Sequence, residues 1–265
     1  MSAKIIDGKA VAAQCRAELK IQVEALKAED ITPGLAVVLV GEDPASQVYV
    51  RNKHKACEEL GIHSEQYTLP ENTGREELLA LIAELNGRKE IDGILVQLPL
   101  PAHLDQKEIL SAIDPEKDVD AFHPFNVGRI MLGDYTYLPC TPAGIMEILR
   151  EYGIDPAGKH CVVVGRSHIV GRPMSMLMLH ANATVTICHT KTRDVQAVAR
   201  EADILVSAAG VLKSLTKDYV RPGQIVIDVS INWDENKINA KGGKGGIAGD
   251  AKFDEVEPIV EAITP

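Results

Sequence analysis

The stretch CVVVGRSHIVGRP, residues 161–173, combines an apolar run, a turn with glycines six residues apart, and a helix start with Pro173 just inside it. The apolar run predicts a buried strand, and the proline predicts the first turn of a helix. A helix N-terminus directs free N–H groups and the positive end of its dipole into such a turn, which favours a bound phosphate. The spacing differs from G-x-G-x-x-G, and glycines at strand-to-helix turns are also common for steric reasons alone.

The sequence around this stretch predicts a parallel α/β unit. A helix is expected over residues 141–152, and a second one from about 171 to 181. Further apolar runs predict strands at residues 184–188, 204–207 and 225–229. Alternating strands and helices form a parallel sheet with right-handed crossovers. The glycine-rich stretch from Gly242 to Gly249 is interpreted as a flexible turn.

The first half of the chain predicts a second unit of the same class. A helix is expected from about Lys9 to Glu29, and LAVVLV at residues 35–40 is the continuous apolar run of a strand buried on both faces. A helix over 43–60, a strand at 63–69, a helix over 75–85 and a strand at 91–97 complete a βαβαβ order.

Between residues 114 and 142 no periodicity is sustained, which indicates the connection between two domains, 1–138 and 139–265. The expected fold class is therefore α/β. It consists of two parallel α/β lobes with an interdomain cleft, and the second lobe is a Rossmann-like NADP-binding domain.

Composition and charge exclude several classes of protein. The 265 residues are 45% hydrophobic and 25% charged, near the globular average, so a disordered, collagen-like or coiled-coil chain is excluded. A net charge of −10 makes nucleic acids and anionic lipid surfaces unexpected partners. The five cysteines form no CxxC pair, the eight histidines show no metal-ligand spacing, and no apolar stretch is long enough to span a membrane. We therefore expect a cytoplasmic protein that needs no metal.

The residues after the strand at 184–188 bear on the choice of cofactor. NAD-binding enzymes usually carry an acidic residue there for the ribose 2′-hydroxyl, whereas this chain has His189, Thr190, Lys191 and Thr192. Together with Arg166, Thr190 and Lys191 could bind a 2′-phosphate, which favours NADP over NAD. The alternative is that Lys191 and Thr192 only cap and solvate the start of a helix.

Candidate residues for chemistry follow two strands of the first domain. Tyr49 and Lys53 are four residues apart, so they lie on one face of the predicted helix, and Gln97 stands at the carboxyl end of the strand at 91–97. Asp118 and Asp120 supply carboxylates in the loop that follows. Such a set suits a polar heterocycle with both donors and acceptors. Tyr and Lys at this spacing are also ordinary on an amphipathic surface, and at least one of the two aspartates is expected to close a turn.

Five ordered motifs closely resemble the bifunctional 5,10-methylenetetrahydrofolate dehydrogenases/cyclohydrolases, the FolD family. They are YVRNK at 49–53, GILVQLPLP at 93–101, PEKDVD at 115–120, PCTP at 139–142 and GRSHIVGRP at 165–173. The resemblance implies NADP-dependent oxidation of 5,10-methylenetetrahydrofolate to 5,10-methenyltetrahydrofolate, followed by hydrolysis to 10-formyltetrahydrofolate. It also implies a role in one-carbon metabolism and purine biosynthesis, and a homodimer that forms through the second lobe.

The same resemblance assigns roles to individual residues. Lys53 is expected to handle protons during hydrolysis, Gln97 to hold Lys53 in place, and Tyr49 to stack on the folate. Asp120 is expected to accept hydrogen bonds from the pterin, with Val96 and Leu98 also at the substrate. The cofactor residues implied are Gly165, Arg166, Ser167, Thr190 and Ile231.

One feature departs from the family pattern. After the position of Pro265, members of the family continue into a Val-Pro-Gly-Gly-Val-Gly-Pro-Met-Thr loop that touches the folate and a final helix, whereas this sequence stops at Pro265. The family's C-terminal loop and helix are therefore expected to be absent here. Two alternative functions remain open from the sequence: an enzyme with only the dehydrogenase step, perhaps with NAD, and a non-catalytic dinucleotide-sensing module.

Overall fold

A computed structural model describes residues 2–238 and 244–265 as two compact units. The N-terminal unit comprises Ala12–Leu138, and the C-terminal unit comprises Pro139–Pro265 together with the residues up to Val11. The predicted first domain, 1–138, therefore differs from the structural unit at its start. The reason is that β1 (Lys4–Ile5) pairs in parallel with β11 (Ala262–Ile263), so the first residues of the chain complete the sheet of the C-terminal unit.

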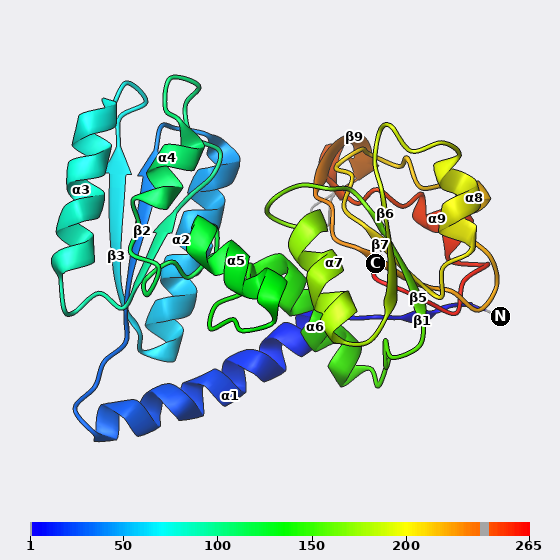
Figure 1. The fold of residues 1–265 in the computed structure, drawn as a ribbon, viewed down its shortest axis with the longest axis horizontal. Coiled ribbons are helices and arrows are strands. Elements are labelled where there is room, and N and C mark those ends of the chain that lie inside the picture. The colour runs from blue at the N-terminus through cyan, green and yellow to red at the C-terminus, as the bar shows by residue number, and fades with distance from the viewer. Residues whose placement is uncertain (1, 239–243) are drawn as a thin grey trace. The chain divides into compact units, whose positions relative to one another are not determined.

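The N-terminal unit is built on a parallel sheet in the order β3-β2-β4 (Figure 1). The strands are β2 (Gly34–Val40), β3 (His63–Leu69) and β4 (Gly93–Val96). Helices α2 (Pro44–Leu60) and α3 (Arg75–Gly87) cover opposite faces of this sheet. Alternate side chains of β2 pack toward α3 (Ala36, Val38, Val40) and toward α2 (Val37, Leu39). The strand is thus buried on both faces, as its sequence predicts.

Three further helices belong wholly or partly to this unit: α1 (Gly8–Ala28), α4 (Gln106–Ser111) and α5 (Pro124–Leu132). Helix α5 lies between residues 114 and 142, a stretch in which the sequence shows no sustained period and predicts no helix or strand before residue 141. It starts with Pro124 in its first turn and ends at Gly133, which has a positive φ of 78°. Its buried residues are Asn126 and Ile130, one turn apart, so the helix is too short and too polar on that face to give a sustained period.

The C-terminal unit contains a six-stranded parallel sheet in the order β1-β11-β8-β7-β5-β6. The remaining strands are β5 (His160–Val164), β6 (Thr184–Cys188), β7 (Ile204–Ser207) and β8 (Ile225–Asp228). The helices are α6 (Cys140–Glu151), α7 (Gly171–His180), α8 (Val195–Arg200) and α9 (Phe253–Val256), with a 3-10 turn at Lys217–Tyr219. The order reverses at β5, because β6 and β7 lie on opposite sides of it. Ligands of open α/β sheets bind at the carboxyl ends of the strands beside such a reversal.

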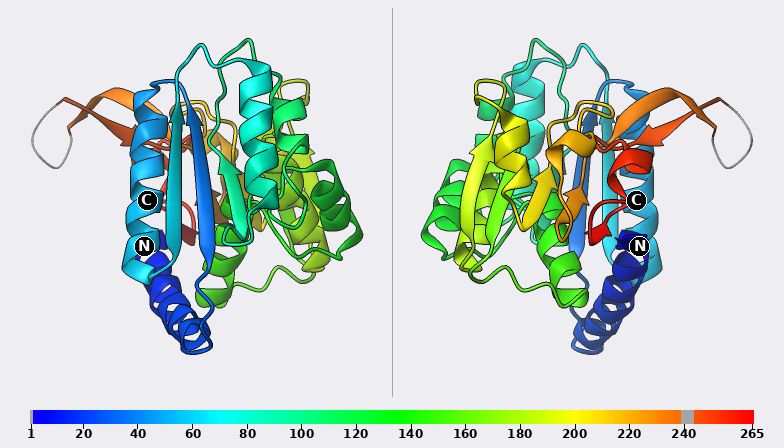
Figure 2. Two further views of the ribbon diagram at one scale, coloured as in Figure 1. Left: turned by 90° about the vertical axis from the view of Figure 1, so that its left-hand side faces the viewer. Right: turned by 90° about the vertical axis from the view of Figure 1, so that its right-hand side faces the viewer.

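An antiparallel hairpin of β9 (Asn232–Ile238) and β10 (Lys244–Ala248) projects from this unit (Figure 2). The prediction of a flexible turn from Gly242 to Gly249 is therefore wrong for Lys244–Ala248, and Gly242 and Gly243 lie outside the described residues. The strand is held by its partner, because the Trp233 ring occupies the space that a Cβ at Gly245 would need. Among the described residues, no helix is both long and apolar enough to cross a membrane.

Candidate active site

Lys53 and Gln97 meet at the carboxyl edge of the small sheet. Helix α2 is capped by the Asp43 carboxylate, which accepts the Ser46 N–H at 2.7 Å, and it carries Lys53 half-buried in its third turn. Gln97 directly follows β4, and its main-chain N–H donates to the Val38 carbonyl at 2.8 Å. Lys53 Nζ donates to Gln97 Oε1 at 2.8 Å, while Gln97 Nε2 donates to the Leu98 carbonyl at 2.7 Å. The amine is thus held in a fixed position by an amide that is itself fixed.

Three other expected substrate residues stand near this pair in the chain. Tyr49 lies one turn before Lys53 on α2, and its side chain is 38% exposed, so a ring face is accessible. Leu98 is half-buried. Val96 is only 2% exposed because its side chain belongs to the core between the sheet and α3. Any contact of Val96 with a ligand would therefore be made by its main chain.

The two aspartates after β4 differ in their surroundings. Asp118 is 1% exposed, and its carboxylate accepts the N–H groups of Phe122 and His123 at 3.2 and 2.8 Å and Asn126 Nδ2 at 2.9 Å. Asp118 therefore closes the loop, the role expected for at least one of the pair. Asp120 is half-buried and lies two residues further along the same turn, which touches β4 through the bridge between Asp118 and Ile94. Asp120 remains the candidate for substrate recognition.

Both glycines of the strand-to-helix turn after β5 are required by close contacts. Gly165 has a φ of 128°, and a Cβ on it would lie 2.3 Å from the Ala208 carbonyl oxygen. A Cβ on Gly171, the first residue of α7, would lie 2.3 Å from the Gly165 carbonyl oxygen. Ser167 Oγ accepts the N–H groups of Val170 and Gly171 at 3.1 and 3.3 Å. The turn is therefore compact, and its residues 165–167 border an open cavity.

A cavity of about 360 Å³ opens at the carboxyl ends of β5, β6 and β7. Four of the expected cofactor residues line it, namely Gly165, Arg166, Ser167 and Thr190. Among the described residues that line it, none is a carboxylate, and Arg166 supplies a positive charge. The hydrogen-bond donors of Arg166, Ser167 and Thr190 and the space beside Gly165 fit a phosphorylated dinucleotide such as NADP.

The turn after β6 is built by its own side chains. The His189 N–H donates to Thr192 Oγ1 at 2.9 Å, and the Lys191 N–H donates to His189 Nδ1 at 3.1 Å. Lys191 itself is exposed. Thr192 therefore closes the turn but does not cap a helix, because the N-cap of α8 is Asp194, whose carboxylate accepts the Ala197 N–H at 3.0 Å. The exposed Lys191 follows Thr190 directly in this turn.

Ile231, the last expected cofactor residue, lines a different and larger cavity of about 670 Å³ together with Ser230 and Asp228. It is 59% exposed on the loop after β8. This loop is hydrogen-bonded to the loop that borders the first cavity, because the Gly210 N–H donates to Ser230 Oγ at 3.2 Å. Burial raises the pKa of the Asp228 carboxyl, whose oxygens accept the N–H groups of Ser230 and Ala251.

Sequence reasoning did not single out Asp250, although it is the most heavily hydrogen-bonded buried carboxylate of the described site region. The only local signal is its place directly after a glycine in a glycine-rich stretch. Burial raises the pKa of the Cys161 thiol to about 12, so this thiol is unreactive near neutral pH. In the described part of the chain, no three or more His, Cys, Asp or Glu side chains are grouped so that they could hold a metal ion.

Comparison with known proteins matches both units to one family. The model of the tetrahydrofolate dehydrogenase/cyclohydrolase catalytic domain matches residues 6–120, and that of the NAD(P)-binding domain of the same family matches residues 139–265. The chain is 54% identical over 265 residues to the bifunctional protein FolD of Moorella thermoacetica, covering all of this chain and 92% of that protein. It is 52% identical to the FolD protein of Acetivibrio thermocellus, again over all of this chain and 90% of that protein.

Solved structures give the same result. The bifunctional enzyme FolD from Campylobacter jejuni superposes with a TM-score of 0.93 at 48% identity, covering all of this chain and 91% of that one. The FolD of Trypanosoma brucei, solved with NADP cofactor and an inhibitor, also superposes with a TM-score of 0.93, at 36% identity and with the same coverage. The chain belongs to the tetrahydrofolate dehydrogenase/cyclohydrolase family.

Proposed function

We propose that this chain oxidises 5,10-methylenetetrahydrofolate with NADP⁺ and hydrolyses the resulting 5,10-methenyltetrahydrofolate to 10-formyltetrahydrofolate, within one-carbon metabolism. The observation that carries the proposal is the Lys53–Gln97 contact at the carboxyl edge of the β3-β2-β4 sheet, in a chain of this family. An amine fixed by an amide at such an edge is suited to proton transfer beside a bound heterocycle.

The oxidation step is one of positioning. Loss of a hydride from the methylene bridge leaves a cation shared by two nitrogens, so alignment of donor and acceptor matters more than a base. We assign recognition of the pterin to Asp120 and stacking on the folate to Tyr49, with Val96 and Leu98 at the substrate. Bound NADP⁺ supplies the hydride acceptor. Gly165, Arg166, Ser167 and Thr190 would hold its phosphates, and Ile231 would lie against its nicotinamide.

The choice of NADP over NAD is supported by charge. Arg166 lines the cavity, Lys191 extends from the neighbouring turn, and no described lining residue is a carboxylate that would repel a 2′-phosphate. The position that NAD-binding enzymes use for an acidic residue is occupied here by the His189–Thr192 turn.

The hydrolysis step needs a base. Water forms a bond to the bridging carbon of the methenyl cation and gives up one proton, which leaves a neutral carbinolamine. One C–N bond then breaks as its nitrogen takes up a proton, and the hydroxyl releases its remaining proton to solvent as the formyl C=O forms. Lys53 Nζ is the group proposed to accept the first proton and to return it to the leaving nitrogen. Gln97 Oε1 accepts from the same Nζ and so sets where the amine points. Gln97 is therefore a positioning residue for this step.

The test is substitution of Lys53 by Met, compared with Lys55→Met on the same helix. Lys55 has a side chain that is 73% exposed and pairs with Glu59 at 3.6 Å, so its loss removes an amine of the same helix without touching the proposed site. NADPH formation measures the dehydrogenase, and decay of added 5,10-methenyltetrahydrofolate measures the cyclohydrolase. We expect Lys53→Met to lower the cyclohydrolase by roughly a hundred-fold or more, the contribution of a positioned base, and to leave much of the dehydrogenase.

The same assays separate the alternatives. Equal loss of both activities in folded Lys53→Met would refute the division of labour between the two steps. NADPH formation without methenyl hydrolysis in the wild-type protein would indicate a dehydrogenase-only enzyme. Cofactor binding without turnover of either folate would indicate a dinucleotide-sensing module.

We further propose a cytoplasmic homodimer that forms through the C-terminal unit. The dimer is supported by β6, an edge strand of the six-stranded sheet whose Ile187 is 38% exposed, since such an edge can pair with a second copy. The compartment is supported by the five cysteines, which form no disulfide in the described part of the chain. Sedimentation equilibrium would measure the oligomeric state.

A further inference from the structure

A fully buried carboxylate lies behind the loops of the two cavities in the C-terminal unit. Asp250, which follows β10, is 0% exposed and lines neither cavity. Its oxygens accept six hydrogen bonds, and in the described part of the chain all of these donors are neutral. They are Ser207 Oγ (2.9 Å), the N–H groups of Ala209 (2.9 Å), Gly210 (3.2 Å) and Val211 (2.7 Å), Ser230 Oγ (2.7 Å) and Asn232 Nδ2 (3.2 Å).

These donors come from two loops that follow neighbouring parallel strands. Four belong to the end of β7 and the loop 208–211, while Ser230 belongs to the loop after β8 and Asn232 is the first residue of β9. The strands run in register, with Ser207 opposite Asp228. One carboxylate therefore joins both loops at the carboxyl edge of the sheet, where parallel sheets bind their ligands.

Each loop contributes to the proposed cofactor site. Ala208, Ala209 and Val211 line the 360 Å³ cavity, and the Ala208 carbonyl lies against Gly165, where a Cβ would come within 2.3 Å of it. Ser230 and Ile231 line the second cavity. A shift of either loop would change the distance between the glycine turn and the residue proposed to lie against the nicotinamide.

We propose that Asp250 is a positioning residue for hydride transfer: without touching the cofactor, it fixes residues 208–211 beside the proposed phosphate cavity and residues 230–232, which include Ile231. An uncompensated buried charge is costly, so a carboxylate with only neutral donors is stable here because it is so fully hydrogen-bonded. This dense bonding holds three consecutive peptide N–H groups in one arrangement. The inference rests on the proposed NADP-dependent oxidation.

The bifunctional reaction provides an internal control. Lys53 and Gln97 lie in the N-terminal unit, and hydrolysis of added 5,10-methenyltetrahydrofolate needs no nicotinamide. In Asp250→Asn, an amide N–H₂ replaces one oxygen and faces a main-chain or side-chain donor, so the loops should shift. We expect kcat/KM for NADP⁺ to fall by roughly ten- to a hundred-fold, and further in Asp250→Ala. The cyclohydrolase rate should stay within about two-fold of wild type, because hydrolysis uses Lys53 and Gln97 of the other unit, which share no hydrogen-bond partner with Asp250.

Asp203→Asn is the matched control at the other end of β7. Asp203 precedes the strand that Ser207 ends, accepts the His160 N–H at 2.9 Å and pairs with Arg221 at 3.1 Å. Its substitution disturbs the same sheet away from the cavities, so KM for NADP⁺ should not change. If the Asp250 variants keep the wild-type kcat/KM for NADP⁺, or lose both activities in the same proportion while folded, the proposal is overturned.

Ser230→Ala decides the matter if the Asp250 variants do not fold. It removes one of the six hydrogen bonds and the acceptor of the Gly210 N–H. We expect a rise in KM for NADP⁺ of roughly three-fold or more, with hydrolysis unaffected. An unchanged KM in folded Ser230→Ala would overturn the proposal. Absence of NADPH formation by the wild-type protein would instead count against the proposed function itself.

Discussion

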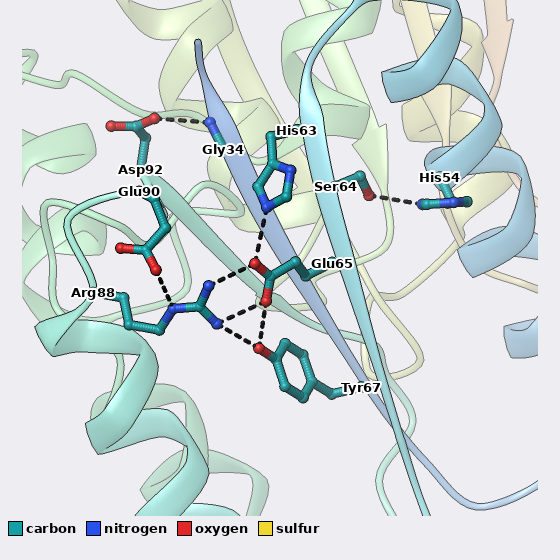
Figure 3. Close-up of polar contacts among 9 residues, drawn as sticks. All are labelled: Gly34, His54, His63, Ser64, Glu65, Tyr67, Arg88, Glu90 and Asp92. Carbon is teal, nitrogen blue, oxygen red and sulfur yellow. Dashed lines mark hydrogen bonds and ion pairs between the residues drawn. The ribbon is translucent and has the colours of Figure 1, made fainter. Parts of the chain in front are cut away.

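Among single residues, Glu65 shows how strongly neighbours can shift a carboxyl group. It lies on the edge strand β3, where His63, Glu65 and Tyr67 point toward Arg88 (Figure 3). Arg88 Nη1 and Nη2 donate to the two Glu65 oxygens at 2.7 and 2.6 Å, and the Tyr67 hydroxyl donates at 2.5 Å. The Arg88 bonds, followed by those from Tyr67 and His63, lower the pKa of Glu65 to about 2. The side chain is 24% exposed, so solvent still screens part of the interaction.

The lowered pKa predicts a defined pH dependence of stability. Because the folded pKa lies below the usual value of 4.5, the ionised Glu65 stabilises the fold above about pH 4.5, and this contribution is lost as the pH falls toward 2. Glu65→Gln should lower the free energy of unfolding by about 1 kcal/mol at neutral pH. The difference from wild type should shrink through the acid range. Urea unfolding at a series of pH values measures both effects.

The control for this prediction is Glu59→Gln. Glu59 is 58% exposed and pairs with Lys55 at 3.6 Å, so the change should have little effect on stability at any pH. A constant difference between wild type and Glu65→Gln from neutral to strongly acidic pH would contradict the assignment.

Among the elements, the strand-turn-helix over residues 160–180 depends on two glycines for steric reasons. Gly171→Ala would place a Cβ against the Gly165 carbonyl at 2.3 Å, so α7 must move away from the turn. We expect a loss of about 1–3 kcal/mol in unfolding free energy and clearly weaker NADP⁺ binding. Gly144→Ala in α6 is the control, because a Cβ there meets nothing within 4 Å. It should be neutral or stabilising by up to about 1 kcal/mol. Thermal unfolding with and without NADP⁺ measures both changes, and equal behaviour of the two variants would contradict the steric argument.

Local sequence patterns predicted the elements in which buried apolar residues recur regularly along the chain. The β2 strand was evident because its side chains are buried on both faces, and the fold class of both units is confirmed. Helix α5 was missed because its buried residues, Asn126 and Ile130, are too few to give a period. Strand β10 was missed because its glycines pack against β9 side chains across the hairpin, Gly245 against Trp233 and Gly246 against Lys237.

The candidate site was also only partly predictable from the sequence. Lys53 and Gln97 are 44 residues apart, but the parallel βαβ order already placed both at one sheet edge. Asp250 could not be foreseen, because its partners lie 18 to 43 residues away and become neighbours only when the loops after β7 and β8 fold against it. Its hydrogen bonds are a property of tertiary packing and leave no periodic signal.

For the molecule as a whole, the charge distribution supports a local site for an anion. The net charge of −10 gives a general repulsion of phosphate groups. The 360 Å³ cavity departs from this average, since Arg166 is the charged residue among its described lining. We therefore expect phosphate binding to depend on the glycine turn, the start of α7 and Arg166, with no favourable contribution from the overall field.

The division of the chain into units gives a last prediction, because its first residues fold with its last. Ile6 is 0% exposed and its N–H donates to the Ile263 carbonyl at 2.8 Å, whereas the preceding Ile5 is 43% exposed. Ile6→Ala should cost about 2–5 kcal/mol, the usual loss for a buried isoleucine, and Ile5→Ala much less.

The loss should appear in the C-terminal unit, to which β1 belongs. Hydrogen exchange is the suitable measurement, since it reports local opening along the chain. In Ile6→Ala, amides of β11 and β8 should exchange faster, because these strands continue the sheet from β1, while amides of β2 in the N-terminal unit should keep their protection. If β2 lost protection as much as β11, or if the Ile5 and Ile6 variants behaved alike, the first residues could not be assigned to the C-terminal unit on energetic grounds.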